Sequence, residues 1–459
     1  MITKIYNQIR VSQPSEELLS WCKQNLVLKN PEYAKKVRMG FWLGNTPKEI
    51  RLYAQDGNDL ILPYGCLNQV LSHAPEEIVT EFREPETIDF RANIPLYDYQ
   101  EKAVVKMQTE VCGILQSPAG SGKTQIGIAL AIALQRKTLW LTHTKDLLNQ
   151  SKERAEQFMS SSLIGTITEG KVHIGKGITF ATVQTMCNLD LNLYRDVWDC
   201  IIVDEVHRVA GSATSVTQFS KVLNSLAARR KYGLSATVHR ADGMIAATFA
   251  LVGPVIYRVP EEAVESKIMR AKIEVVPTGV VTSPEFLDTD GTLIYSKLLS
   301  YLSTNDDRNY LIETKLVENQ EHFNLILSDR LTNLQEIMTM LPYELRQKSA
   351  LIDGKMTTKA GKLQREKAIS DMREGKLNFL FATYRLAKEG LDIPRLDRLH
   401  LVSPQKDYAI ITQSVGRVQR TFEGKSQPIV YDYVDNIRFL VKMFKKRCTT
   451  YRKLKCEME

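Results

Sequence analysis

The chain has 459 residues, of which 43% are hydrophobic and 25% are charged. At roughly 100 to 200 residues per domain, this length allows two to four domains. The composition is ordinary for a folded protein, which excludes disorder as the default state. The 61 Lys and Arg residues exceed the 53 Asp and Glu residues, for a formal charge of +8. That charge permits a polyanionic partner but does not require one.

The seven cysteines form no Cys-x-x-Cys pair and are odd in number. This argues against a zinc ribbon and against a disulfide framework, and it suits a reducing compartment. The N-terminus has no apolar core of a signal peptide, and no window approaches about 18 uninterrupted apolar residues. We therefore expect a soluble intracellular protein that makes no membrane contact.

Residues 1–88 are predicted to form a separate small α+β domain. Its predicted helix and strand-like pieces are Ser15–Gln24, Glu49–Tyr53 and Leu60–Leu62. The segment from Asn30 to Trp42 combines basic and aromatic residues, which suits contact with nucleic acid. Aromatic side chains are more often part of a core, so both interpretations of this segment stay open.

Residues 89–260 contain a series of short apolar strands separated by helical segments. The predicted strands are Cys112–Gln116, Thr138–Thr142, Ile178–Thr182, Cys200–Val203 and Tyr232–Leu234. Near-continuous apolar strands with helices between them are typical of a parallel sheet that is covered on both faces. This region is therefore predicted to be an α/β lobe.

A second series of the same kind lies within residues 311–459. Its predicted strands are Asn324–Leu327, Ala350–Ile352, Phe379–Ala382, Arg398–Val402 and Ile429–Tyr431. Two such series predict two α/β lobes in tandem. Residues 261–310 lack the alternation and contain prolines, so we interpret them as the connection between the lobes, with some structure of its own.

The second lobe ends in a basic tail. From Arg438 to Glu459 there are eight basic residues against two acidic residues. Such a run predicts a helix that faces a polyanion, but charge runs are commonly just solvated, and both interpretations stay open.

The strand that ends at Gln116 runs into a candidate phosphate loop. Its residues are Ser117, Pro118, Ala119, Gly120, Ser121, Gly122, Lys123 and Thr124, and a predicted helix follows. The glycines let backbone N–H groups turn inward around phosphates, and the helix N-terminus favours negative charge. Lys123 would neutralise the β- and γ-phosphates of ATP, and Thr124 would supply a hydroxyl ligand to Mg²⁺. A glycine-rich turn without a nucleotide is disfavoured by this strand–loop–helix context, although Ser117 replaces the usual first glycine.

Two acidic residues follow the apolar strand at Cys200–Val203. Acidic side chains at the exit of a buried strand are costly unless they have a function. Asp204 is placed to hold Mg²⁺, and Glu205 is placed to orient or deprotonate an attacking water. A helix cap is the alternative for such a pair, and the preceding phosphate loop disfavours it.

These motifs together resemble those of the superfamily 2 helicases. The run Asp204–His207 resembles the DExH box, and Ser235–Thr237 resembles motif III. Thr383–Asp392 resembles motif V, and Gln413–Arg420 resembles motif VI. The resemblance spans roughly residues 95 to 435 and implies two RecA-like lobes, ATP as cofactor with Mg²⁺, and a nucleic-acid substrate.

Two details narrow the resemblance within the superfamily. The run Gly233–Thr237, followed by Arg240 and Asp242-Gly243, is similar to that of the XPB-like helicases. The Gln-Ser-x-Gly-Arg-x-x-Arg form of motif VI is most similar to that of the UvsW-like phage recombination helicases. Members of both groups act on DNA, so the resemblance implies a DNA substrate.

The resemblance also implies roles for single residues. Gln100 matches the glutamine that contacts adenine, although Tyr97 stands where relatives often carry Arg. The motif V match adds Gly390 and Asp392 to the nucleotide site. Gln413 would pair with His207. Arg417 and Arg420 match the arginine fingers, whose alternative role is surface salt bridging.

Five residues are implied to contact the nucleic-acid strand, and they are Thr142, Lys145, Thr182, Gln184 and Thr383. They lie in segments that resemble motifs Ia, Ib and V. Hydroxyl, amide and lysine groups suit phosphate oxygens and carry little base information. Each residue could equally be a helix cap or a turn residue.

We therefore predict an ATP-dependent DNA helicase or translocase that unwinds or branch-migrates forked or branched DNA in replication, recombination or repair. Its expected partners are branched or duplex DNA with single-stranded regions, and replication or recombination proteins. We expect a monomer in the cytoplasm of a prokaryotic or phage-infected cell, with an N-terminal domain that by analogy recognises DNA structure. The alternatives are a DEAH-type RNA helicase, a motor subunit of a restriction or defence complex, and a nucleotide-dependent clamp without turnover.

Overall fold

A computed structural model describes residues 1–118, 120–210, 212–238, 244–265, 268–354, 356, 358–388, 391 and 393–458. The chain folds into two compact units, Met1–Val264 and Glu265–Glu459. Each unit contains its own mainly parallel sheet and its own hydrophobic cores. No helix in the described part of the chain is long and apolar enough to cross a membrane.

The first unit is built on an eight-stranded sheet of order β11-β10-β12-β9-β13-β14-β8-β15. All neighbours are parallel except β10 and β11. The five strands predicted for this lobe are confirmed as β8 (Cys112–Gln116), β9 (Thr138–Thr142), β12 (Ile178–Thr182), β13 (Cys200–Val203) and β14 (Arg230–Ser235). The sequence did not predict the strands at or next to the sheet edges, which are β10 (Ile164–Thr168), β11 (Lys171–His173) and β15 (Val255–Arg258).

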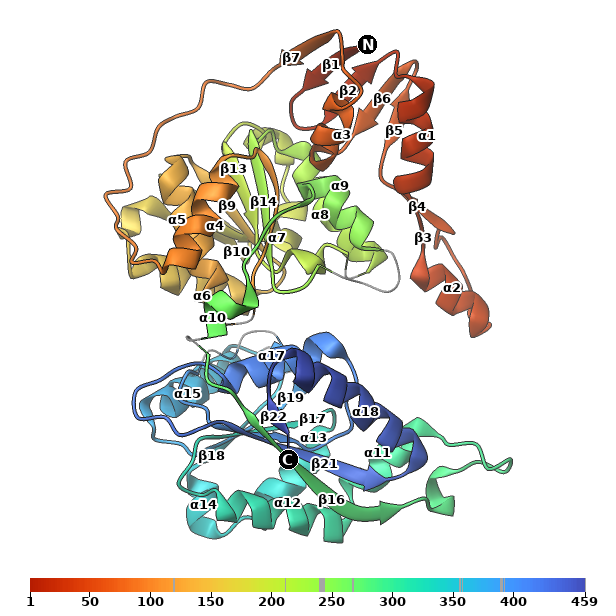
Figure 1. Cartoon of the computed structure of the whole chain (residues 1–459), viewed down its shortest axis with the longest axis vertical. Coiled ribbons are helices and arrows are strands. Elements are labelled where there is room, and N and C mark those ends of the chain that lie inside the picture. Colours follow the sequence, from red (N-terminus) through yellow and green to blue (C-terminus); the bar gives the residue numbers. More distant parts are fainter. Residues whose placement is uncertain are drawn as a thin grey trace. The chain divides into compact units, whose positions relative to one another are not determined.

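Helices cover both faces of this sheet, with α4 and α5 on one side and α8 and α9 on the other (Figure 1). Their bounds are α4 (Asp98–Gln108), α5 (Lys123–Leu134), α6 (Lys145–Glu156), α7 (Val183–Cys187), α8 (Ala213–Ser225), α9 (Ile245–Val252) and α10 (Glu261–Glu265). The central strands β9, β12 and β13 are buried along their whole length, because both faces of the sheet are covered.

The N-terminal region forms a five-stranded sheet of order β5-β6-β2-β1-β7. The strands are β1 (Ile2–Ile5), β2 (Ile9–Ser12), β5 (Ala54–Asp56), β6 (Asp59–Leu62) and β7 (Glu77–Thr80), with helices α1 (Glu16–Asn25) and α3 (Leu67–Leu71). The predicted helix at residues 15–24 is confirmed as α1, which Ser15 caps.

This N-terminal sheet does not stand apart from the lobe, contrary to the expected boundary at residue 88. Its core residues and those of the lobe, among them Ala247 and Ala250, form one hydrophobic cluster. A Cβ added to Gly65 would lie 2.4 Å from the carbonyl oxygen of Phe249, so the two parts meet backbone to backbone. The N-terminal region and the first lobe therefore form one compact unit.

Residues 27–51 form a small excursion from the N-terminal sheet. Strands β3 (Val27–Lys29) and β4 (Glu49–Arg51) pair antiparallel at the base of this excursion, and helix α2 (Pro31–Arg38) lies between the two strands in the sequence. In Figure 1, α2 lies apart from both sheets of the first unit.

The second unit is built on a seven-stranded, all-parallel sheet of order β18-β19-β17-β20-β21-β16-β22. The five predicted strands are confirmed as β17 (Asn324–Ser328), β18 (Ser349–Ile352), β19 (Phe379–Thr383), β20 (Arg398–Leu401) and β21 (Ile429–Asn436). The helices are α11 (Tyr295–Ser303), α12 (Asp306–Glu318), α13 (Leu331–Met340), α14 (Tyr343–Gln347), α15 (Lys359–Glu374), α16 (Tyr384–Lys388), α17 (Tyr408–Val418) and α18 (Arg438–Lys453).

The expected connection at residues 261–310 is mostly part of the second unit. Strand β16 (Lys272–Val281) pairs along β21, and the short β22 (Glu457–Met458) pairs on its other side. The sequence did not predict this strand, because it contains Pro277 and a proline within an apolar run argues against a place inside a sheet. The ladder accommodates it with a shift of register between Pro277 and Val281.

Candidate nucleotide site

The phosphate loop joins β8 to α5, as the sequence predicts. Gly120 and Gly122 have φ angles of 81° and 76°, in the left-handed region that favours glycine. A Cβ on Gly122 would lie 2.6 Å from Nε2 of Gln100, so a larger residue here would displace the Gln100 amide. Helix α5 then begins at Lys123. Ala119 lies outside the described residues.

Hydrogen bonds within the phosphate loop, from β14 and from α4 hold this loop in place. The buried Ser117 donates from Oγ to Oγ of Ser121 at 2.5 Å, and its backbone N–H donates to the carbonyl of Ser235 at 2.9 Å. The Tyr99 hydroxyl and Nε2 of Gln100 both donate to the carbonyl of Ser121, at 3.0 and 2.9 Å. The serine in the first loop position is therefore part of the support of the loop.

Gln100 is 2% exposed and is bonded to protein at both ends of its amide. Besides the bond to Ser121, its Oε1 accepts from the backbone N–H of Tyr97 at 3.0 Å. The structure thus assigns Gln100 to the phosphate loop and to the start of α4. The adenine contact stays a prediction.

The two acidic residues lie at the end of β13. Asp204 is 4% exposed and accepts from the backbone N–H of Glu205 at 2.9 Å and from Oγ of Ser151 at 3.3 Å. Glu205 has a φ angle of 47°, an uncommon conformation for a residue with a side chain. Such strain persists where the surrounding structure holds it and is frequent at active sites.

Glu205 lies between two cationic or potentially cationic groups. Its Oε1 is 3.9 Å from Nζ of Lys123, and its Oε2 is 3.2 Å from Nδ1 of His207. His207 Nδ1 is also 3.0 Å from Oγ of Ser235. The phosphate loop, the DExH residues and Ser235 of β14 therefore form one cluster within the first unit.

The environment drives the pKa values of the two carboxyls in opposite directions. Burial and then the charge of Glu205 raise the pKa of Asp204. Burial would also raise the pKa of Glu205, but Lys123 and His207 together outweigh it and lower that pKa below its ordinary value. Glu205 is therefore the carboxyl that holds its negative charge most firmly.

The donor set fits a nucleoside triphosphate with a divalent cation. In the described part of the chain, Nε2 of His207 is buried without a hydrogen-bond partner, and the ion-pair contact of Oε2 of Glu205 is with Nδ1 of His207. Buried polar atoms without a partner are rare, and a bound ligand is one reason for them. Lys123 and the loop N–H groups suit phosphate oxygens, and Thr124 and Asp204 supply the oxygen ligands that Mg²⁺ prefers.

The second unit carries the motif VI residues on and after α17. Asp407 caps this helix by accepting from the backbone N–H of Ile410 at 2.9 Å. Gln413 and Arg417, four residues apart, share one face of the helix. Oε1 of Gln413 is buried and has no hydrogen-bond partner in the described part of the chain. Arg420 follows the helix, in a bridge with Ile268.

Several motif residues fall outside the described residues. These are Gly390 and Asp392 of motif V, and Arg240, Asp242 and Gly243 of the XPB-like run. Thr383 of the same motif V is described, and it ends β19 in a half-buried position.

Two of the threonines implied to contact nucleic acid make hydrogen bonds within the fold, and their contact with nucleic acid stays a prediction. Thr142 is fully buried, and its hydroxyl donates to the carbonyl of Thr144 at 3.0 Å. Thr182 is 7% exposed and caps α7 by accepting from the backbone N–H of Thr185 at 3.3 Å. The helix-cap alternative is thus the observed one for Thr182.

Lys145 and Gln184 lie closer to the surface than these threonines. Nζ of Lys145 is 2.7 Å from Oε1 of Glu169, and Nε2 of Gln184 is 3.3 Å from Nδ1 of His143. Their contact with nucleic acid stays a prediction.

Sequence reasoning missed two residues of the cluster. Ser151 of α6 donates to Asp204, and Tyr99 of α4 donates to the phosphate loop. Tyr99 directly precedes Gln100, which is its one signal in the sequence, and Ser151 belongs to no motif that the sequence singled out.

Two family models match the chain. Residues 93–240 match the model described as "Type III restriction enzyme, res subunit". Residues 306–422 match the model described as "Helicase conserved C-terminal domain".

Three curated proteins are similar to the chain over most of its length. "Putative ATP-dependent RNA helicase L396" of Acanthamoeba polyphaga mimivirus is 26% identical over 84% of this chain and 72% of its own length. "Probable helicase D10" of Escherichia phage T5 is 28% identical, over 70% of this chain and 67% of its own. "DNA 3'-5' translocase XPB2" of Sulfurisphaera tokodaii is 27% identical, over 71% and 79%.

Two solved structures match the chain with different TM-scores. A fragment of a putative HsdR subunit of a type I restriction enzyme from Vibrio vulnificus gives a TM-score of 0.52 at 17% identity, covering 74% of this chain and 65% of that one. The crystal structure of UvsW of phage T4 gives a TM-score of 0.42 at 18% identity, covering 100% and 99%.

Proposed function

The chain belongs to the superfamily 2 helicases, with XPB-type and phage helicases among its relatives, and from this premise we propose that it is an ATP-dependent DNA helicase or translocase. The family predicted from the motifs is thereby confirmed, as is the α/β fold with two RecA-like lobes. The helicase families consist of ATP-hydrolysing enzymes. The DNA substrate and the remodelling of forked or branched DNA are our proposal.

One observation carries this proposal, namely the cluster that joins the phosphate loop to the DExH residues. Lys123 approaches Glu205 to 3.9 Å, and His207 approaches the same carboxylate to 3.2 Å. The cluster combines a phosphate-binding cation with a carboxylate whose lowered pKa keeps it ionised at neutral pH, so that it can accept a hydrogen bond from a water and orient that water. A nucleotide-dependent clamp without turnover would not need this carboxylate.

Each residue has a distinct role in the proposed hydrolysis. Lys123 and the loop N–H groups bind the β- and γ-phosphates. Thr124 and Asp204 would hold Mg²⁺, which would supply positive charge next to these phosphates. Glu205 orients the attacking water and accepts its proton. We assign to Arg417 and Arg420 the stabilisation of charge that develops during transfer, an effect of about 10³- to 10⁵-fold for such arginines.

Net movement follows if the grip on nucleic acid depends on the bound nucleotide. Binding and hydrolysis shift a protein between conformations only through different affinities for the ligand in each. The proposal of DNA rather than RNA is supported by the XPB-like run in motif III and the UvsW-like form of motif VI. The relatives' names point both ways, since one is called an RNA helicase and another a DNA translocase.

Steady-state ATP hydrolysis tests the proposal directly. The full chain is assayed with single-stranded, duplex, forked and four-way DNA, and with RNA of the same shapes. We expect the strongest stimulation from forked and four-way DNA. Stronger stimulation by RNA would favour an RNA helicase, and no stimulation by any nucleic acid would overturn the proposed function.

The matched variants in this assay are Glu205→Gln and Glu101→Gln. Glu205→Gln keeps the shape of the side chain but removes the proton acceptor, so we expect hydrolysis to fall by about 10²- to 10⁴-fold while ATP still binds. Glu101 is an exposed residue of α4, and its substitution is expected to leave hydrolysis unchanged. Full turnover in Glu205→Gln would contradict the role assigned to Glu205, and a wild-type chain that binds ATP without hydrolysing it would support a clamp.

A second candidate is a motor subunit of a restriction complex. It is favoured by the restriction-enzyme family model over residues 93–240 and by the fold of the HsdR fragment. Such a motor would act with a nuclease partner. Stable co-purification of a nuclease subunit with the full chain would support this function over the first.

A further inference from the structure

The excursion between β3 and β4 ends in exposed apolar side chains. We call this surface the tip, and it consists of Val37, Met39, Phe41 and Trp42. Their exposed fractions are 55%, 50%, 56% and 89%. Helix α2, from which the tip extends, has no buried residue. Apolar side chains gathered at one exposed place commonly mark a binding surface.

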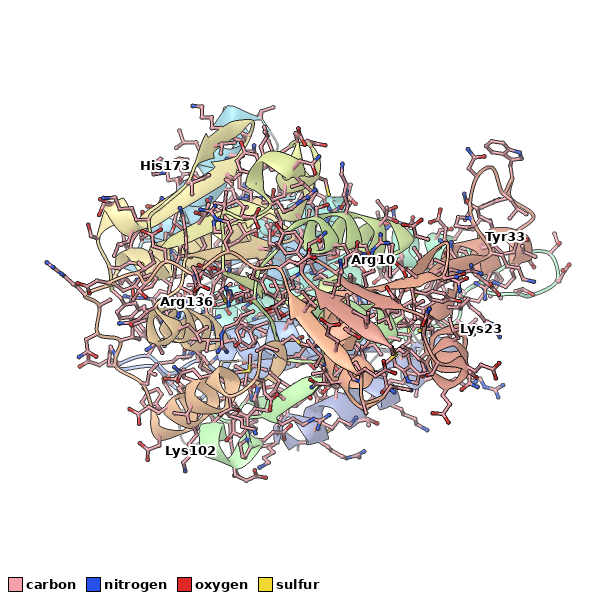
Figure 2. All side chains as sticks on the ribbon, turned by 90° about the horizontal axis from the view of Figure 1, so that it is seen from above. Arg10, Lys23, Tyr33, Lys102, Arg136 and His173 are labelled. Carbon is pink, nitrogen blue, oxygen red and sulfur yellow. The ribbon has the colours of Figure 1, made fainter. Side chains whose placement is uncertain are left out.

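Hydrogen bonds hold the tip in place. Asn30, 1% exposed, donates to the carbonyl of Pro47 at 2.8 Å and accepts from the backbone N–H of Glu32 at 3.0 Å. Nζ of Lys36 donates to the Thr46 hydroxyl at 2.7 Å. In Figure 2, Tyr33 of α2 lies at the rim of the first unit, far from Arg136 and His173 of the lobe. The excursion therefore presents the tip on an anchored support.

The edge of the Trp42 ring contacts Gly44 of the same excursion. A Cβ added to Gly44 would lie 2.8 Å from Cζ3 of Trp42, so the indole lies against the backbone of Gly44. Gly44 has a φ angle of 50°, which glycine adopts without strain. An aromatic ring that contacts the backbone at its edge and is still 89% exposed is suited to stacking against a flat ligand.

The excursion that carries the tip is basic. Residues 27–51 contain six basic residues against two acidic residues. The basic residues are Lys29, Lys35, Lys36, Arg38, Lys48 and Arg51, and all except Lys36 are exposed. Aromatic side chains on which bases stack, combined with cations that attract phosphates, are the combination by which proteins bind unpaired nucleic acid. A protein partner would not require this excess of cations.

We propose that the tip stacks on the unpaired base or terminal base pair at a DNA branch point, while the basic residues of the excursion contact the adjoining phosphates. Trp42 and Phe41 supply the stacking surface. This proposal rests on the proposed function, because it names the element with which the helicase recognises a branch. Recognition is assigned to residues 27–51 and not to the N-terminal sheet as a whole.

Tryptophan emission of the full chain gives a direct readout. Of the four tryptophans, Trp140 and Trp198 are 0% and 2% exposed and Trp21 is half-buried, whereas Trp42 is 89% exposed. Forked DNA is therefore expected to quench the Trp42 emission, and an unbranched duplex with the same ends blocked by hairpins is expected not to. The Trp42→Phe variant, which lacks this emission, is the blank for the titration.

Equilibrium binding to the same two DNA molecules tests the stacking itself. We expect Trp42→Ala to weaken binding to forked DNA about tenfold, which corresponds to the loss of one stacked base, and Trp42→Phe to restore most of it. The control is Leu193→Ala, an apolar residue of the same unit that is 74% exposed. Lys35→Ala should instead reduce the salt dependence of binding by about one unit of slope.

The outcomes separate this proposal from the proposed function. A loss confined to forked DNA and to the Trp42 variant supports the tip, even if no nucleic acid stimulates ATP hydrolysis. Unchanged binding in Trp42→Ala, an equal loss for both DNA molecules, or an equal loss in Leu193→Ala overturns it. If ATP hydrolysis is stimulated by forked DNA but Trp42 emission does not respond, the proposed function stands and the tip proposal fails.

Discussion

Lys231 is a basic side chain that the fold buries almost completely, at 1% exposure. Its Nζ donates to the carbonyls of Asn7 at 3.1 Å and Leu223 at 2.6 Å, and lies 4.9 Å from the centre of the Tyr64 ring. Burial lowers the pKa of Lys231 to about 7. A neutral amine has two N–H donors, and the two carbonyls accept both.

This burial predicts a pH dependence of stability. The pKa of Lys231 is about 7 in the folded protein and near its ordinary value of 10.5 in the unfolded chain. Between these values the unfolded chain binds one more proton, so the group's contribution to the free energy of unfolding rises with pH, by up to about 1.4 kcal/mol per pH unit. In Lys231→Met this rise is expected to be absent.

Urea unfolding followed by tryptophan emission at pH 7 to about 9.5 measures the effect, because all four tryptophans lie in the first unit. The matched control is Lys102→Met, which removes an exposed lysine of α4. If the free energy of unfolding changed with pH in the same way for the wild-type protein and for Lys231→Met, the buried, neutral state of this lysine would be contradicted.

At the scale of the element, helix α18 is attached to the sheet by a buried ion pair. Arg447 donates from Nε and Nη2 to the two carboxylate oxygens of Asp432 at 2.8 and 2.7 Å, and from Nη1 to the carbonyl of Gln405 at 2.7 Å. The Tyr451 hydroxyl donates to the same carboxylate at 2.7 Å. One residue of the basic tail is thus a structural cation, and it holds the segment that precedes α17.

Arg447→Met is therefore expected to destabilise the second unit. The substitution leaves Asp432 buried without its cation, and the loss of one partner of a buried pair costs about 3–5 kcal/mol. Arg452→Met, an exposed position of the same helix, is expected to change stability by no more than about 0.5 kcal/mol. Chemical unfolding followed by circular dichroism distinguishes the two, and equal effects would argue against the structural role.

At the scale of the whole molecule, the first unit depends on its N-terminal sheet. The Tyr64 hydroxyl donates to the carbonyl of Arg229 at 2.7 Å, and the Tyr6 hydroxyl donates to Asp196 at 2.6 Å. Tyr64 itself belongs to the hydrophobic cluster that the sheet shares with the lobe. Removal of the sheet would expose that cluster to water.

We expect a chain without residues 1–88 to bind a hydrophobic dye strongly and to unfold at least about 10 °C lower than the full chain. The control replaces residues 31–47 by a short glycine linker, which removes α2 and the tip but leaves the shared cluster in place. Thermal unfolding followed by tryptophan emission measures the unfolding temperature of the two altered chains and of the full chain. A truncated chain as stable as the full one would restore the separate domain that the sequence predicted.

Much of the nucleotide site could be predicted because its residues are consecutive. The run from Ser117 to Thr124 carries its own geometry, since the glycines and the following helix suffice to shape it. The nucleic-acid contacts were harder to predict, because a threonine at the end of a strand suits both a phosphate and a helix cap. Thr182 caps α7, and only the position of the Thr185 N–H decides this.

By itself, the sequence determined the two α/β lobes and the phosphate and DExH motifs, because runs of apolar residues and contiguous loops express local preferences. The tertiary structure alone decided the place of β16, the burial of Lys231 and Arg447, and the attachment of the N-terminal sheet. These depend on partners that are distant along the chain, as with Lys231 and Asn7, which are 224 residues apart. The energy of a buried charge is set by such partners, and a local pattern does not contain them.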